Sequence, residues 1–212
     1  MTDTGRAGRM RIERRLVTAR HGADLLDRKR QIMTDELERL QLNADRVSEE
    51  WSTRARDATG WLQRAAALDG YGRIRETAPA RLAEVGITWG GAMGVGFPES
   101  VSCDIPAITR RGGTSALRYA ASTHHAALVA GAQCAAAERA VRLVQTELAA
   151  TRLRQRAVEH RWIPRLEREL DAIRRRLAEQ ELEEALRLRW AADLQGGTIG
   201  PRTPAADEDG AR

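Results

Sequence analysis

The glycine-rich segment 90–96 is the first place where this sequence could do chemistry, because closely spaced glycines can cradle a phosphate. A phosphate loop also needs particular neighbours. No Gly-Lys-Ser or Gly-Lys-Thr follows, the glycines do not have the order GxGxxG, and no helix is predicted directly after them. We therefore interpret these glycines as turn residues.

Histidines and cysteines are also poorly spaced for a metal or redox site. His124 and His125 are adjacent, so on a helix their side chains diverge by about 100° and cannot both bind one metal ion from that helix. Cys103 and Cys134 are far apart and form no CxxC pair. We predict two free thiols in a reducing cytoplasm and no metal ligand.

Paired carboxylates are the remaining candidates for acid–base chemistry. Glu49-Glu50 and Glu183-Glu184 are predicted to lie on solvated helix faces, where nothing would shift their pKa values. No Ser/His/Asp or Cys/His arrangement is apparent. The sequence therefore predicts no active site, no cofactor and no catalytic activity of its own.

A heptad pattern of apolar residues dominates the first third of the chain. It predicts a coiled-coil helix over residues 10–78, whose patterned part would span roughly 80 Å. We call the positions of this pattern the first seam, and only Arg30 and Arg54 among them are not apolar. The first seam consists of Leu16, Ala19, Ala23, Leu26, Arg30, Met33, Leu37, Leu40, Ala44, Val47, Trp51, Arg54, Ala58, Trp61, Ala65 and Leu68.

The remaining segments complete the predicted fold. Residues 79–113 are rich in glycine and proline and contain short β-prone pieces, so we expect a small insert with a β-hairpin. We expect a second coiled-coil helix over residues 114–194, with Thr114 or Ser115 as its N-cap. We expect residues 195–212 to form a disordered tail. The predicted fold class is all-α: a long antiparallel two-helix coiled-coil hairpin with a small Gly-rich insert.

Folding the two helices back on each other suggests partners for the arginines in the first seam. If the numbers of facing residues add to about 198, Arg30 lies level with Glu167 and Glu169, and Arg54 lies near Glu147. The alternative is that both arginines reach outward to water. We favour an ion pair for Arg30 and solvent for Arg54.

Tryptophan and proline positions give further expectations. Trp51, Trp61 and Trp162 fall on seam positions and are predicted core residues, whereas Trp89 and Trp190 fall outside and are better interface candidates. Pro164 lies inside a four-plus-four step of the second seam, from Trp162 to Leu166 to Leu170. It removes a backbone donor and predicts a kinked helix there.

Composition supports long helices more than a compact core. Charged residues make up 31% and aromatics 4% of the chain, with a net charge of +5. Acids and bases are interspersed along the predicted helices, so we expect a mixed solvated surface and no nucleic-acid partner. No apolar run reaches membrane-spanning length and no signal peptide is apparent, so we expect a soluble intracellular protein without direct membrane insertion.

Three segments, in order along the chain, carry a more specific pattern. The first contains Arg15-Leu16, Ala19, Gly22, Leu25-Leu26 and Lys29-Arg30. The second contains Trp89-Gly90, Met93-Gly94-Val95 and Pro98. The third contains Thr151-Arg152, Arg154, Ala157-Val158-Glu159 and Ile163-Pro164, followed by Leu177, Glu179, Glu181, Glu184 and Arg187-Leu188.

Over about residues 9–190, these segments resemble the D subunit of the V-type/A-type rotary ATPases, the central shaft of that machine. Lys29, the only lysine in the chain, falls on the family's Lys-Arg pair. Three departures are the absence of the family's usual Pro-Thr before the first helix, Gln31 where the family has an acid, and Arg156 where it has Asn.

The resemblance implies a function and a set of partners. The chain would turn within the hexamer of A and B subunits, with both chain ends in its central cavity. Its middle segment would face the F subunit and the ion-carrying ring, to which the C/d subunit would link it. It would transmit torque between ATP hydrolysis or synthesis and proton or sodium transport, on the cytoplasmic face of the plasma membrane. The implied interface or motif residues are Gly22, Lys29, Arg30, Trp89, Met93, Arg152, Arg154, Glu159 and Pro164.

Two other classes of protein remain open at this point. A coiled-coil scaffold or export chaperone without a rotary partner would explain the heptads, but not the placement of Gly22, Lys29-Arg30 and Ile163-Pro164. A helical arm that grips RNA would need a basic stripe on one side, and Arg152, Arg154, Arg156 and Arg161 come closest to forming one.

Overall fold

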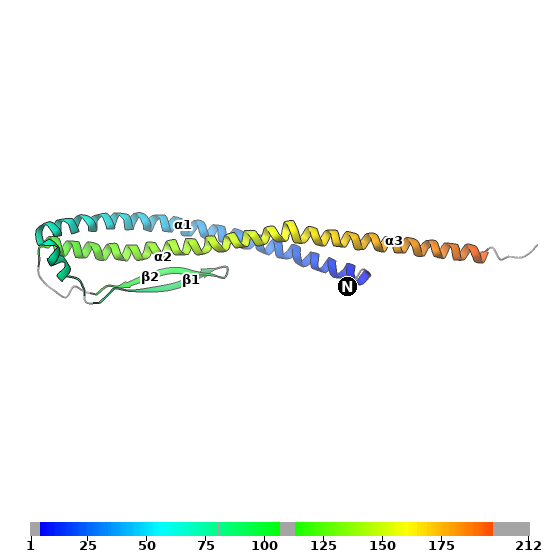
Figure 1. The fold of residues 1–212 in the computed structure, drawn as a ribbon, viewed down its shortest axis with the longest axis horizontal. Coiled ribbons are helices and arrows are strands. Elements are labelled where there is room, and N and C mark those ends of the chain that lie inside the picture. Colours follow the sequence, from blue (N-terminus) through cyan, green and yellow to red (C-terminus); the bar gives the residue numbers. More distant parts are fainter. Residues whose placement is uncertain (1–4, 80, 107–112, 197–212) are drawn as a thin grey trace, which may run out of the picture. The chain divides into compact units, whose positions relative to one another are not determined.

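A computed structural model describes residues 5–79, 81–106 and 113–196, with only the backbone of the last two. Two long helical segments flank a two-stranded antiparallel sheet, which confirms the predicted all-α hairpin with a small insert. Figure 1 labels the elements in chain order: α1 (Arg6–Glu76), β1 (Glu84–Ala92), β2 (Val95–Asp104), α2 (Ser115–Ala157), a π-helical turn η1 (Val158–Trp162) and α3 (Ile163–Gly196). The tail predicted over 195–212 lies outside the described residues from 197 onward, and α3 includes residues 195 and 196.

The chain divides into two compact units. The larger unit is Gly22–Val158 and contains most of α1, the sheet and α2. The smaller unit combines Met1–His21 with Glu159–Arg212, so its described part is the start of α1 paired with α3.

The first seam forms the core of the larger unit. Every buried residue of α1 in this unit is a seam position: Ala23, Met33, Leu40, Val47, Ala58 and Ala65. They face a row on α2 in which alanine is the commonest buried residue: Ala116, Leu117, Ala120, Ala130, Cys134, Ala137, Ala140, Val144, Leu148 and Thr151. Small residues on one helix let the two backbones approach closely, which explains the Ala-rich composition of α2.

One end of the larger unit is closed by hydrogen bonds between α1 and the start of α2. Thr114 is the N-cap of α2, and its hydroxyl accepts from the Leu117 N–H, as its position in the sequence predicted. The Asp69 carboxylate in turn accepts the Thr114 N–H at 3.1 Å. Immediately after Asp69, Gly70 has φ +74°, a left-handed conformation that interrupts α1 where the sequence weakens.

The register between the helices differs from the predicted one. Asp27 bonds to Gln155, and Trp51 lies against Gly131, so the numbers of each facing pair add to 182 and not to about 198. The helices already meet at Asp69, whereas the prediction placed the turn at Ala78.

In this register Arg30 does not form the ion pair predicted for it, and Arg54, which we expected to reach solvent, pairs on its own helix. Arg30 bonds to Asp27 at 2.8 Å, not to Glu167 or Glu169, and Arg54 pairs with Glu50 at 2.6 Å, not with Glu147. Both partners lie within about one turn on α1 itself. The seam arginines thus reach sideways along their own helix.

The smaller unit has its own apolar core. Ile12 and Leu16 of α1 pack with Leu166 and Leu170 of α3, and Ile163 and Ile173 lie partly buried against them. Ion pairs flank this core, between Arg20 and Glu167 at 2.8 Å, between Arg174 and Glu13 at 3.2 Å, and between Arg6 and Glu181 at 3.5 Å.

Of the three tryptophans predicted to lie in the core, one packs against a buried cluster and two are exposed. Trp61 packs against the cluster around Ala65 and stacks on Tyr119, with ring centroids 4.9 Å apart. Trp51 is 42% and Trp162 is 53% exposed, so the prediction is wrong for both. Trp51 lies on the surface over Gly131, where a Cβ would come within 3.0 Å of its ring nitrogen.

For Trp162, the cause is the π-helical turn. A π-turn contains one more residue than an α-turn. The buried and half-buried positions consequently pass from Val158 to Ile163 and then resume the heptad spacing at Leu166, Leu170, Ile173 and Leu177. The extra residue displaces Trp162 from the seam to the surface.

The β-hairpin is fixed to the helices at its turn end. Met93 (φ +50°) and Gly94 (φ +85°) form a two-residue connection with positive φ at both positions, which suits the twist of a hairpin. Phe97, which is 4% exposed, lies in the cluster that contains Met33, Leu40 and Ala140. β2 is the strand that packs on α2, beside which the hairpin lies in Figure 1. Within the described residues, no helix is long and apolar enough to cross a membrane.

Replacing Phe97 with Ala should release the hairpin. The change removes a buried aromatic ring and leaves a cavity, so we expect the free energy of unfolding to fall by about 3 kcal/mol. Urea denaturation followed by circular dichroism measures this loss. The exposed Trp89→Ala is the matched control and should change stability by less than about 0.5 kcal/mol. Equal effects of the two substitutions would show that Phe97 does not anchor the sheet.

Candidate functional site

A group of polar side chains interrupts the seam between α1 and α2 in the larger unit. We call it the polar layer: Asp27, Lys29 and Arg30 from α1, and Glu147, Thr151, Arg154 and Gln155 from α2. It brings together Lys29, Arg30 and Arg154, three of the residues that the sequence singled out. Asp27, Glu147 and Gln155, which join them, were not among the predicted site residues.

Glu147 is the centre of one half of the polar layer. Its Oε1 accepts from Lys29 Nζ at 3.0 Å across the helix pair and from Arg154 Nη1 at 3.1 Å along α2. The side chains of Lys29 and Glu147 are 24% and 28% exposed, so water screens this pair only in part. The Lys29 ammonium, followed by the Arg154 guanidinium, holds the pKa of Glu147 below its ordinary value.

Asp27 is the centre of the other half. Its Oδ1 accepts from Arg30 Nε and Nη2 at 3.1 and 2.8 Å, and from Gln155 Nε2 at 3.2 Å. Its Oδ2 accepts from Gln31 Nε2 at 3.2 Å. Hydrogen bonds from Arg30 first, and then from Gln155, lower the pKa of Asp27.

Thr151 lies one helical turn from both Glu147 and Gln155 and is fully buried. Its hydroxyl has no hydrogen-bond partner among the described residues. Burying such a group costs about 1–3 kcal/mol relative to a paired one. The alignment of the two helices therefore rests on the paired groups beside Thr151, namely Lys29 with Glu147 and Asp27 with Gln155.

The contacts of the polar layer hold the two helices in place. Each carboxylate accepts hydrogen bonds from cationic or amide donors. Within the described ranges, no group of three or more His, Cys, Asp or Glu residues could hold a metal ion. The arrangement specifies alignment between two helices.

The π-helical turn η1 is a second local feature near the motif residues. Pro164 lies two residues after it and has no N–H to donate to the carbonyl four residues earlier, that of His160. Glu159, another predicted site residue, is half-buried inside the turn. The Arg15 guanidinium lies 5.9 Å from the centre of the Trp162 ring. The sequence predicted a kink here from Pro164, but not a π-turn.

The other predicted site residues lie apart from the polar layer. Trp89 is 61% exposed on β1, Met93 is in the hairpin turn, and Arg152 is exposed on α2. Gly22 lies in α1 where a Cβ would meet no atom within 4 Å, so packing inside the chain does not require glycine there.

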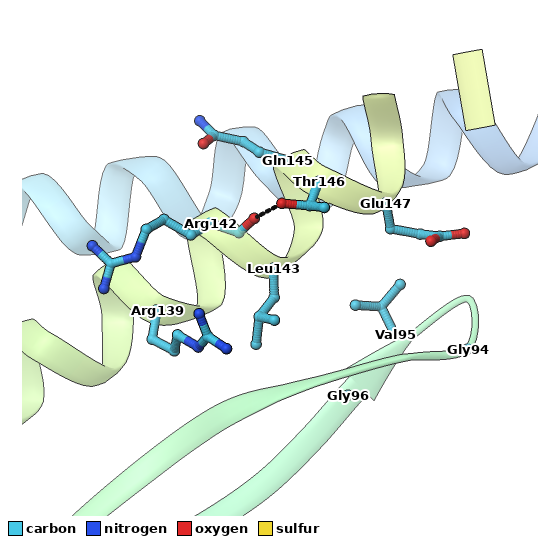
Figure 2. A pocket seen from close by; sticks show the side chains of 9 residues that line it. All are labelled: Gly94, Val95, Gly96, Arg139, Arg142, Leu143, Gln145, Thr146 and Glu147. Carbon is cyan, nitrogen blue, oxygen red and sulfur yellow. Dashed lines mark hydrogen bonds between the residues drawn. The ribbon is translucent and has the colours of Figure 1, made fainter. Parts of the chain in front are cut away.

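A cavity of about 780 Å³ lies beside the polar layer, between α2 and the turn of the hairpin (Figure 2). Its charged groups do not converge on a common point. Arg142 pairs with Glu138 at 3.2 Å, and Glu147 is held by Lys29 and Arg154. The lining residues are Gly94, Val95, Gly96, Arg139, Arg142, Leu143, Gln145, Thr146 and Glu147.

The contact between Lys29 and Glu147 should be measurable as a coupling energy. We expect a double-mutant cycle with Lys29→Met, Glu147→Gln and the double variant to give about 1 kcal/mol, because the pair is partly shielded from water. Thermal or urea unfolding supplies the free energies. The exposed pair Arg165–Glu169 is the control and should give a smaller coupling. A coupling near zero for Lys29–Glu147 would contradict its role in alignment.

The carboxylates of the polar layer also predict a pH dependence. Their pKa values in the folded state lie below the ordinary 3.8 of Asp and 4.5 of Glu, so the folded state favours the ionised forms. The stability that they contribute is complete above about pH 4.5 and is lost as the pH falls through the lowered values.

Melting temperature measured between about pH 3 and 7 tests this expectation. The double variant Asp27→Asn with Glu147→Gln should lose less stability on acidification than the wild type. Glu38→Gln, on an exposed face of α1, should retain the full acid dependence. Parallel curves for wild type and the double variant would contradict the assignment.

Comparison with known proteins agrees with this architecture. The family model for the D subunit of ATP synthase matches residues 9–193, which cover both helical segments and the hairpin. A search of curated proteins finds no match. Members of the matched family are non-catalytic stalk subunits of rotary ATPases. The chain therefore belongs to the ATP synthase D-subunit family.

Proposed function

We propose that this chain is the rotor shaft of a V/A-type ATPase and transmits torque between the A/B hexamer and ion transport across the membrane. The observation that carries the proposal is a row of exposed apolar side chains near the end of α3. The most distal ion pair between α1 and α3 in the described residues joins Arg6 to Glu181. Residues 182–194 continue beyond it for about 20 Å of helix.

This end of α3 exposes large apolar side chains. Leu182, Leu186, Trp190 and Leu194 are 63%, 45%, 69% and 77% exposed. They recur every four residues and therefore form a ridge along one side of the helix. We call it the α3 ridge. A row of large exposed apolar side chains supports contact with a partner.

An apolar ridge suits a rotating contact. Apolar contacts are non-directional, so the ridge can face successive similar surfaces without breaking specific hydrogen bonds. We place the α3 ridge in the central cavity of the A and B subunits. ATP chemistry would occur in those subunits, while this chain would turn.

The polar layer supports the same role from within the shaft. Torque tends to slide or twist one helix against the other. The contacts of Lys29 with Glu147 and of Asp27 with Gln155 oppose such slippage, because sliding would break hydrogen bonds in a partly dry interface.

The hairpin would face the F subunit, and the C/d subunit would link the chain to the ion-carrying ring. The complex would sit at the cytoplasmic face of the plasma membrane. Gly22, Arg152, Glu159 and Pro164, which lie outside the polar layer, are then candidate contacts for the partner subunits.

Co-expression with A, B and F subunits tests the proposal. We expect a stoichiometric complex with ATPase activity. The double variant Leu186→Ser with Trp190→Ser should lower incorporation at least about tenfold, because two apolar anchors of the α3 ridge are removed. Leu153→Ser, at a 67% exposed position of α2, is the matched control and should incorporate normally. Failure of the wild type to join any of these subunits would favour a scaffold or export chaperone and defeat the rotor assignment.

A further inference from the structure

An exposed side of α2 carries a row of arginines in the larger unit. Arg142, Ala149 and Arg156 follow one another at seven-residue spacing, so they lie on one side of the helix. Arg139 and Arg152 lie three residues from Arg142 and Ala149 and flank the same side. All five side chains are exposed. We call the four arginines the arginine face, which extends over about 25 Å of helix.

The acids of α2 offset only part of this charge. Residues 138–157 contain five Arg and two acids, Glu138 and Glu147. Glu147 is already bonded within the polar layer, and Glu138 pairs with Arg142 at 3.2 Å. Among the described residues, the other three members of the arginine face form no ion pair.

The elements packed against α2 do not neutralise the arginine face either. The register places residues 25–43 of α1 opposite residues 139–157, and this part of α1 has four acids and four bases. The hairpin turn lies beside one end of the arginine face (Figure 2), and residues 85–98 contain no charge. Glu99, the next acid of the hairpin, lies near Arg39 of α1. Positive charge is therefore in excess along this side of α2.

Helix stability does not explain these arginines. An exposed arginine can support its helix by pairing with an acid three or four residues away, as Arg46 does with Glu50 at 3.5 Å. Arg139 and Arg152 have no acid at these spacings in either direction. Arg152 and Arg156 are four residues apart, and like charges at this spacing destabilise a helix. The arginine face therefore supports a contact outside the chain.

The chemistry of the arginine face favours an acidic protein segment as its partner. A guanidinium group binds a carboxylate through two parallel hydrogen bonds. α2 contains no aromatic residue after Tyr119, so the face lacks the stacking platform with which proteins hold single-stranded RNA. A symmetric contact with a second copy of this face would bring arginines against arginines.

We propose that the arginine face binds a segment of a partner protein that presents Asp or Glu side chains along the helix. The spread of the arginines does not suit one compact anion, but it suits an extended segment. The partner would be a subunit of the same complex, so the inference rests on the proposed function in that respect.

Photocrosslinking in the assembled complex tests which molecule covers the arginine face. Ala149→p-benzoylphenylalanine keeps all four arginines and should crosslink to a partner subunit at a segment rich in Asp and Glu. Leu42→p-benzoylphenylalanine, at a 73% exposed position of α1, is the reference and should not label that segment. The inference is overturned by no crosslink from position 149, or by a crosslink to nucleic acid, to a second copy of this chain or to a segment without acids.

Charge removal measures the electrostatic contribution. Arg139→Gln with Arg152→Gln should lower the crosslink yield from position 149 at least about fivefold at low salt, and the difference should shrink as salt rises. Arg28→Gln with Arg118→Gln removes the same charge from exposed positions of the larger unit outside the face, and should leave the yield unchanged. Unchanged helical circular dichroism would show that both variants are folded.

The isolated full-length chain gives a test that does not depend on the other subunits. A fluorescent oligoglutamate peptide should bind it, and the Arg139/Arg152 variant should bind at least about fivefold more weakly. An oligouridylate RNA that binds more tightly than the peptide would contradict the choice of partner. If the wild type joins no A, B or F subunit, the proposed function fails and the peptide alone decides the inference. If the complex forms but the Arg139/Arg152 variant changes neither the crosslink nor peptide binding, the inference fails while the rotor assignment stands.

Discussion

Close contact between small side chains along the seam of α1 and α2 is the constraint on which the larger unit depends. Ala65 and Ala140 are fully buried and Ala130 nearly so. Alanines bring the backbones together, but they select an alignment weakly, because a heptad-shifted pair of helices would present almost the same surface. Alignment must therefore come from groups that do not repeat.

Those non-repeating groups are few and lie at separate levels of the larger unit. Asp69 holds the Thr114 N–H where the helices first meet, and Trp51 covers Gly131 farther along. The polar layer adds the contact of Lys29 with Glu147. The two kinds of contact have different roles, because uniform apolar packing gives cohesion while specific contacts prevent slippage between the helices.

The sequence predicted the parts of the fold that depend on local or periodic chemistry. Heptads identified the buried positions of α1 within the larger unit, and capping preferences predicted Thr114 or Ser115 as the N-cap of α2, of which Thr114 is the one observed. The register between α1 and α2 could not be predicted from the sequence pattern. The pattern repeats, so many offsets satisfy it equally, and the predicted offset placed Glu147 near Arg54 instead of beside Lys29.

The same limit applies to the candidate site. Lys29 and Arg30 were found through a resemblance, but Asp27 and Gln155 gain meaning only when two distant helices are aligned. The i,i+3 spacing of Asp27 and Arg30 was an available local signal. No comparable local signal marks Thr151, since a threonine on a seam is unremarkable until its burial is known.

The π-helical turn at Val158–Trp162 has a consequence for how such a shaft can vary in length. Inserting one residue into an α-helix rotates everything downstream by about 100° and would turn an apolar stripe toward water. A π-turn absorbs the added residue locally, and the stripe resumes at Ile163. A π-turn can therefore join two heptad segments whatever their lengths. A single-residue insertion then shifts the heptad phase at that turn and does not interrupt the helix.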